Sequence, residues 1–149
     1  MYKILVVDDE SIEREGISFL IEKYKFPLEV AQATNGKTAL EYMRTHPIDI
    51  LLTDVKMPQM DGLELARHTF EKYPDVRILV FSAYGEFEFA KKAMAAQAVS
   101  YLLKPIEVDE FQRVMTQIIA QCDELSEKKK DEQQRGEEYR QQLLFRLVT

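Results

Sequence analysis

Apolar residues gather in five short runs along the first two thirds of the chain, and each run is followed by a segment of helical length. The runs cover residues 3–7, 28–33, 48–53, 77–82 and 100–103. They are largely continuous rather than alternating with polar residues, which is typical of strands buried on both faces. The pattern therefore predicts a parallel sheet with helices on both sides.

The segments between the runs predict helices over residues 11–24, 36–46, 63–73 and 87–96, and from residue 108 onwards. Apolar or small residues recur at helical spacing in the first of them (Ile12, Gly16, Phe19, Leu20) and in the third (Leu63, Leu65, Ala66, Phe70). Each crossover has room for one helix, and right-handed crossovers give an open, doubly wound α/β sheet. The expected fold is the flavodoxin-like (βα)5 sheet with strand order 2-1-3-4-5.

The character of the chain changes after residue 122. Residues 123–142 carry seven acidic and five basic side chains, and the last eight residues become apolar again. Heptad positions that continue from Ile118 are interrupted at Lys129, Glu132 and Gly136. We expect a globular domain over residues 1–122 and a helical linker over residues 123–149, with a coiled coil, a solvated helix and partial disorder all left open.

Composition narrows the functional classes. The chain has a net charge of −6 and no cluster of Lys and Arg, so direct binding of nucleic acid by this segment is disfavoured. A single cysteine, Cys122, fits a reducing compartment. The N-terminus resembles no signal peptide, and no apolar run reaches membrane-spanning length. These features predict a cytoplasmic protein that does not contact a membrane.

Polar residues that could bind a ligand or take part in a reaction lie at the predicted carboxyl ends of the strands. They are Asp8 and Asp9 after the first strand, Asp54 after the third, Ser82 at the end of the fourth and Lys104 after the fifth. Ligands of such sheets bind beyond the carboxyl ends, where the strand order reverses. The sequence therefore predicts one site built from all of these residues.

Three carboxylates at one edge repel one another, at a cost on the order of 4 kcal/mol for each pair about 4 Å apart. One lysine cannot offset this repulsion, so the cluster favours a divalent cation or raised pKa values. Neither His46 nor His68 lies near a strand end, and an all-oxygen ligand set favours Mg²⁺.

With Mg²⁺ bound, Asp54 could attack a phosphoryl donor, while Lys104 and Ser82 meet the charge on the phosphoryl oxygens. A purely structural alternative is that Asp8 and Asp9 cap the first helix and Lys104 forms a salt bridge with Asp54. The coincidence of all these groups at one edge favours the phosphoryl-acceptor interpretation.

These motifs resemble the receiver domains of bacterial two-component response regulators. The matching residues are 6–10 (Val-Val-Asp-Asp-Glu), 53–58 (Thr-Asp-Val-Lys-Met-Pro), 61–62 (Asp-Gly), 82–83 (Ser-Ala) and 104–105 (Lys-Pro). The resemblance implies that a histidine kinase phosphorylates Asp54. It also implies that Asp9, Asp54 and the backbone carbonyl of Lys56 ligate Mg²⁺, that Asp8 acts through water, and that the Lys104–Pro105 bond is cis. A regulatory phosphoacceptor rather than an enzyme is expected.

Residues 84–93 and 101–106 look like those of YesN-type regulators, which carry a helical linker and then an AraC-type DNA-binding domain. The resemblance implies that DNA is contacted only through such a domain, which this sequence does not contain. It further implies a switch in which Ser82 moves towards the phosphate and Tyr101 rotates. The signal would then appear, through a homodimer, on the face formed by the fourth helix, fifth strand and fifth helix.

Several details remain hypotheses from the sequence. Lys56 and Tyr84 lie two residues after Asp54 and Ser82, where they could shield the phosphate from water. Phe87, Phe89 and Met94 are candidates for a partner surface or for core packing. Two other functions stay open: a stand-alone protein-binding module, and a Mg²⁺-dependent phosphatase of the haloacid dehalogenase type. The adjacent Asp8-Asp9 pair and the lack of room for a cap domain argue against the phosphatase.

Overall fold

The computed structural model describes residues 1–93, 95 and 99–148. Within them, five parallel strands form one sheet in the order β2-β1-β3-β4-β5, which confirms the predicted flavodoxin-like topology. The strands are β1 (Tyr2–Val7), β2 (Leu28–Ala33), β3 (Ile50–Asp54), β4 (Arg77–Ala83) and β5 (Val99–Lys104).

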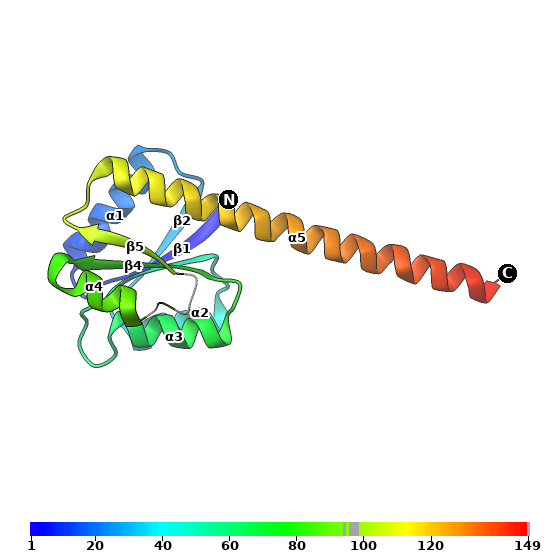
Figure 1. The fold of residues 1–149 in the computed structure, drawn as a ribbon, viewed down its shortest axis with the longest axis horizontal. Helices are drawn as coiled ribbons and strands as arrows, with labels where there is room; N and C mark the ends of the chain where they lie inside the picture. The colour runs from blue at the N-terminus through cyan, green and yellow to red at the C-terminus, as the bar shows by residue number, and fades with distance from the viewer. Residues whose placement is uncertain (94, 96–98, 149) are drawn as a thin grey trace.

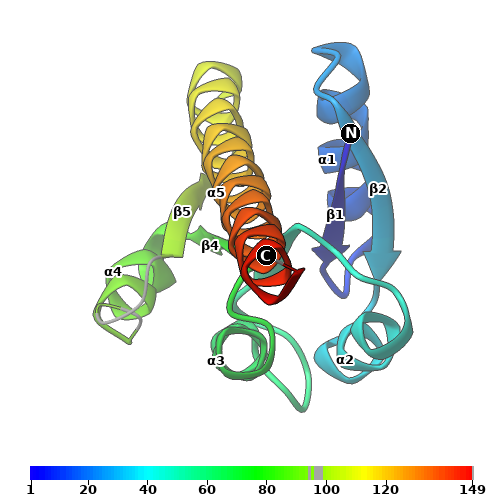
Figure 2. The same cartoon turned by 90° about the vertical axis from the view of Figure 1, so that its right-hand side faces the viewer.

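Helices cover both faces of the sheet. They are α1 (Ser11–Lys23), α2 (Gly36–Thr45), α3 (Gly62–Lys72), α4 (Tyr84–Ala93) and α5 (Val108–Val148). Helices α1 and α5 lie on one face, and α2, α3 and α4 lie on the other (Figures 1 and 2). The architecture is therefore a three-layer α/β sandwich.

Alternate residues of β1 supply the two halves of the core, because successive side chains of a strand point to opposite faces. Ile4 and Val6 belong to the cluster that includes Phe111 of α5. Leu5 and Val7 belong to the cluster on the face of α2 and α3. All four of these β1 side chains are buried, which agrees with the continuous apolar runs in the sequence.

The inward face of α1 differs from the one that the sequence pattern suggested. Ile17 and Ile21 are buried against the sheet, whereas Ile12 is 75% and Phe19 is 60% exposed. The helix carries two apolar stripes, and the sheet covers only one of them. Periodicity alone does not distinguish two such stripes when both have helical spacing.

Two other predictions needed correction. In α3, Phe70 is partly exposed and Thr69 is buried in its place, with its hydroxyl donating to the carbonyl of Leu65 at 2.8 Å. Helix α4 begins at Tyr84, directly after β4, rather than at residue 87. Gly85 is a poor helix former, so local propensity suggested a later start.

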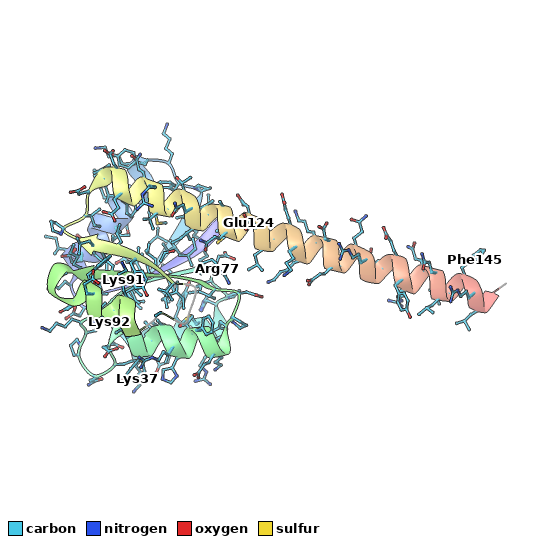
Figure 3. The ribbon with its side chains drawn as sticks, viewed as in Figure 1. Lys37, Arg77, Lys91, Lys92, Glu124 and Phe145 are labelled. Carbon is cyan, nitrogen blue, oxygen red and sulfur yellow. The ribbon has the colours of Figure 1, made fainter. Side chains whose placement is uncertain are left out.

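Helix α5 continues far beyond the sandwich (Figure 1). Its first part packs on the sheet through Phe111, Met115 and Ile118, and its side chains are exposed from residue 127 to residue 147. Figure 3 labels Glu124, close to where the helix leaves the globular part, and Phe145 near its far end. In the described residues, no helix combines the length and hydropathy needed to cross a membrane.

Two contacts tie the base of the projecting helix to the sandwich. The hydroxyl of Tyr2 donates a hydrogen bond to Asp123, and Lys129 forms an ion pair with Asp75 at 2.9 Å. Both contacts lie at the edge of the sheet opposite the carboxyl ends of the strands. They fix the direction in which α5 leaves the domain.

Candidate functional site

The register of the sheet brings the predicted site residues together. Val7 of β1 pairs with Thr53 of β3, so the residues that follow them, Asp8 and Asp54, lie side by side at the carboxyl edge. Ala83 at the end of β4 pairs with Lys104 at the end of β5. The carboxyl ends of the neighbouring strands β1, β3, β4 and β5 thus bring the predicted residues to one edge of the sheet.

Three carboxylates form a compact group there. One oxygen from each of Asp8, Asp9 and Asp54 lies within 4.8 Å of the others. Asp8 and Asp54 are buried, whereas Asp9 is exposed. An all-oxygen set of this size, open to solvent on one side, fits a hard divalent cation such as Mg²⁺ that keeps part of its water shell.

Backbone amides orient the two buried carboxylates. The amide of Val55 donates to Asp54 Oδ1 at 2.9 Å, and the amide of Glu10 donates to Asp8 Oδ1 at 2.9 Å. The N-cap of α1 is Glu10, and no side chain caps that helix end. The aspartates therefore do not serve as the helix cap that the structural alternative required.

The pKa of Asp54 is raised from 3.8 to about 6. Burial is the largest cause, and the negative charge of Asp8 adds to it, while the nearby Lys104 ammonium acts in the opposite direction. A carboxylate in this state gains from any cation that enters the cluster.

Lys104 places its ammonium group beside two of these carboxylates. Its Nζ lies 3.3 Å from Asp54 Oδ1 and 3.5 Å from Asp8 Oδ2, and it stands 4.6 Å from the centre of the Phe81 ring. Burial opposes its charge, but Asp54 and Asp8 outweigh this effect and raise its pKa. The Lys104–Pro105 peptide bond is cis, as the resemblance implied. The salt bridge of the structural alternative is thus present, within the same cluster.

A cavity of about 550 Å³ opens beside this cluster. Its lining residues are Asp9, Glu10, Asp54, Lys56, Met57, Pro58, Ala83, Glu86 and Lys104. The cavity gives a small anionic group access to Asp54 from solvent. Hollows of about 430 and 650 Å³ elsewhere in the described residues are each lined by only one carboxylate and one lysine.

The loop after β3 is shaped by Gly62. A Cβ atom on Gly62 would stand 1.7 Å from the carbonyl oxygen of Asp54, a distance that no side chain tolerates. The Gly62 amide donates to the carbonyl of Val55 at 2.8 Å, and Asp61 caps α3 by accepting from the Glu64 amide. The Asp-Gly pair therefore closes the loop tightly beneath Asp54.

Ser82 and Tyr101 lie in the surroundings of the cluster. Ser82 is fully buried, and its Oγ has no hydrogen-bond partner within the described part of the chain. Tyr101 is partly buried and packs edge-on against Phe87, with ring centroids 6.0 Å apart. Burial raises the pKa of Tyr101.

The remaining predicted residues lie at the mouth of the cavity or outside the described residues. The side chain of Lys56 is 87% exposed and forms an ion pair with Glu86 at 3.8 Å. Tyr84 begins α4, but its side chain lies outside the described residues, as do the side chain of Phe89 and all of Met94.

Sequence reasoning missed two residues near the cluster. Glu86 lies four residues after Ser82, in the first turn of the helix that follows β4, and this position was the available signal. Arg14 donates to the carbonyl of Asp8 at 2.7 Å from one turn into α1. No local motif marks a side chain that reaches a backbone carbonyl in this way.

Comparisons with known proteins agree with this geometry. Residues 4–116 match the family model of the response regulator receiver domain. The transcriptional regulatory protein YesN of Bacillus subtilis is 41% identical over 122 residues, which cover 81% of this chain and 33% of that protein. The response regulator GacA of Pseudomonas aeruginosa is 33% identical, with 80% of this chain and 56% of that protein covered. The chain thus spans about a third to a half of these relatives.

Solved structures give the same result. The receiver domain of AraT, a response regulator from Geobacillus stearothermophilus, is 37% identical with a TM-score of 0.75, and the match covers 86% of this chain and 98% of that one. A two-component transcriptional regulator AraC from Clostridium phytofermentans is 34% identical with a TM-score of 0.75, covering 83% and 97% of the two chains. The chain therefore belongs to the family of response regulator receiver domains.

Proposed function

We propose that Asp54 accepts a phosphoryl group from a histidine kinase and that the resulting aspartyl phosphate switches the domain. Receiver domains are regulatory domains controlled by phosphorylation, and they generally bind Mg²⁺ at an acidic cluster. The observation that carries the proposal is the group of Asp8, Asp9 and Asp54 within 4.8 Å, with Lys104 3.3 Å from Asp54.

Asp8, Asp9 and Asp54, with the backbone carbonyl of Lys56, would hold Mg²⁺. When bound, the ion would offset the repulsion among the carboxylates and the charge on the phosphoryl oxygens. The ligands are all hard oxygen atoms, which is the set that Mg²⁺ prefers.

In the transfer, one carboxylate oxygen of Asp54 forms a bond to phosphorus as the bond between phosphorus and the donor nitrogen breaks. The electron pair of that bond stays on the donor nitrogen, and the other ring nitrogen carries a proton throughout, so the histidine leaves as a neutral imidazole. The Lys104 ammonium is placed to stabilise the phosphoryl oxygens, and the unpartnered hydroxyl of Ser82 could donate to one of them.

The readout would pass through Ser82 and Tyr101 to the face formed by α4, β5 and α5. Ser82 is buried without a hydrogen-bond partner in the described residues, so a new acceptor nearby would attract it. Tyr101 packs on Phe87 of α4, so its rotation would change the surface of that helix. We infer that this face forms a homodimer in the phosphorylated state.

We also propose that the receiver unit comprises residues 1–122 and that residues 123–149 begin a linker to an AraC-type DNA-binding domain. The last buried side chain of α5 is that of Cys122, and the helix is largely exposed beyond it. The similarity to YesN, a transcriptional regulatory protein, supports control of transcription.

Lys56 and Tyr84 are further candidates for setting the lifetime of the phosphate. Lys56 lines the same cavity as Asp54 and lies at its mouth. Replacing Tyr84 with alanine should shorten the half-life of the aspartyl phosphate if the ring shields it, and an unchanged half-life would reject that role.

The proposed function is tested by incubating the protein with acetyl phosphate, with Mg²⁺ or with excess chelator, and by measuring the intact mass. Mg²⁺-dependent addition of one phosphoryl group to the native chain, and its absence in Asp54→Asn, is expected. Equal modification of the two proteins would reject Asp54 as the acceptor.

A further inference from the structure

An ion pair spans the mouth of the cavity that leads to Asp54. Lys56 Nζ lies 3.8 Å from Glu86 Oε1. Lys56 follows β3 by two residues, and Glu86 lies in the first turn of α4. The pair therefore connects the loop that follows the acceptor aspartate to the helix on the expected signalling face.

The charges that line the cavity make this pair unusual. Four acidic residues contribute to the lining (Asp9, Glu10, Asp54, Glu86), and only Lys56 and Lys104 balance them. Lys104 is already engaged by Asp54 and Asp8. Among the described residues, Lys56 is therefore the one lining cation whose ion-pair partner, Glu86, lies outside the carboxylate cluster.

Lys56 is also free to exchange partners. Its side chain is 87% exposed, whereas that of Glu86 is 29% exposed. An exposed ion pair contributes little free energy, so a stronger anion nearby can replace the carboxylate. A phosphoryl group on Asp54 adds a charge of roughly −1.5 to −2 and three acceptor oxygens, which makes it such an anion.

We propose that Glu86 is a positioning residue that holds Lys56 at the cavity mouth, and that a phosphoryl group on Asp54 takes Lys56 from it. This inference rests on the proposed phosphorylation of Asp54. Before phosphorylation, the pair tethers the loop after β3 to α4. After it, Lys56 contacts the phosphoryl oxygens, and the first turn of α4 loses its tether to the site.

The competition between two anions for one lysine predicts coupling between the residues. Glu86→Gln should tighten the binding of beryllofluoride, a mimic of the phosphoryl group, by about threefold in Mg²⁺, which is the scale of an exposed ion pair. Lys56→Gln should weaken it by a similar factor. In the double variant, the effect of Glu86→Gln should be largely lost, because no lysine remains to be released.

The matched control is Lys129→Gln, which removes an exposed ion pair with Asp75 at the opposite edge of the sheet. It should leave beryllofluoride affinity unchanged. Additive effects of Glu86→Gln and Lys56→Gln would overturn the proposal while leaving phosphorylation of Asp54 in place. Failure of the native protein to bind beryllofluoride would instead overturn the proposed function. It would also overturn the proposed competition between Glu86 and the phosphoryl group for Lys56.

A second measurement follows the Glu86 carboxylate itself, first in the metal-free protein. In metal-free protein, the ¹³C resonance of the Glu86 carboxylate should shift when Lys56 is replaced by Gln, and should not shift in Lys129→Gln. Binding of beryllofluoride in Mg²⁺ should move the Glu86 resonance of the native protein towards its position in Lys56→Gln. An unchanged Glu86 resonance in metal-free Lys56→Gln would show that Lys56 and Glu86 do not pair, and would overturn the proposal.

Discussion

Burial of Asp54 governs how the metal-free protein responds to pH. Its pKa is about 6 in the folded chain, against an ordinary value of 3.8. Between these values the folded state binds more protons than the unfolded state, so this group's contribution to stability falls as pH rises through that window. Above about pH 6, the ionised Asp54 lowers the stability of the fold.

Replacing Asp54 with Asn should therefore stabilise the metal-free protein. At about pH 7.5 the free energy of unfolding should rise by about 3 kcal/mol, since the pKa is raised by about two units and each unit corresponds to about 1.4 kcal/mol. The gain should shrink towards pH 4, where folded Asp54 is protonated and the unfolded group is close to its ordinary pKa of 3.8. Urea unfolding in chelator at the two pH values measures the difference, and an equal gain at both would contradict this account.

Lys104 acts on the same carboxylate from 3.3 Å. Lys104→Met should slow phosphorylation by acetyl phosphate by about 100-fold, the scale seen when one preorganised electrostatic group is removed. The rate of appearance of the phosphorylated mass measures the effect. Lys72→Met, on the far part of α3, should keep the native rate, and a native rate in Lys104→Met would remove the lysine from the mechanism.

At the scale of elements, the loop between β3 and α3 depends on the absence of a side chain at Gly62. A Cβ there would meet the Asp54 carbonyl at 1.7 Å, and the contacted atom is rigid backbone. Gly62→Ala should lower the free energy of unfolding by at least about 1–3 kcal/mol, the range for overpacking. Chemical denaturation measures it.

Gly16 and Gly136 offer matched controls for this substitution. Both lie within helices, and a Cβ on either would meet nothing within 4 Å. Alanine at Gly16 should stabilise the protein by about 0.5–1 kcal/mol, because alanine favours the helix over glycine. Equal effects of alanine at Gly62 and Gly16 would contradict the steric account of the loop.

The sequence predicted the order of the strands and the edge at which the site forms, because continuous apolar runs and helix-length crossovers permit few topologies. It did not predict which stripe of α1 packs inward. Ile12 and Phe19 have helical spacing as good as that of Ile17 and Ile21, and only the position of the sheet separates the two pairs.

Contacts between elements far apart in the chain also could not be predicted from the sequence. The Lys56–Glu86 ion pair joins the loop after β3 to the first turn of α4, and its formation depends on where α4 begins. The sequence pattern predicts this helix from residue 87, whereas α4 begins at Tyr84, directly after β4, even though Gly85 is a poor helix former. Heptad spacing likewise did not reveal that α5 runs unbroken to Val148.

At the scale of the whole molecule, the projecting part of α5 has no sheet to pack on (Figure 1). Most of the stability of helices in proteins comes from packing, so an isolated exposed helix is only marginally stable. Backbone amides beyond residue 127 should exchange with deuterium much faster than those near Phe111 and Met115. Comparable protection of both segments in the monomer would contradict the structure.

Tyr101 is the proposed link between the site and dimerisation. Tyr101→Ala should leave phosphorylation of Asp54 at its native rate but weaken dimerisation of the phosphorylated protein by several-fold, because the ring packs against Phe87 on the expected dimer face. Sedimentation in acetyl phosphate and Mg²⁺ measures it. Native dimerisation in Tyr101→Ala would reject the switch role.

The most direct test is to locate the phosphoryl group after reaction with acetyl phosphate and Mg²⁺. Borohydride reduction converts an aspartyl phosphate to homoserine, which peptide mass spectrometry assigns to one position. The account predicts homoserine at position 54 and none when a chelator replaces Mg²⁺. Homoserine at another aspartate, or equal conversion of Asp54 without a divalent ion, would contradict it.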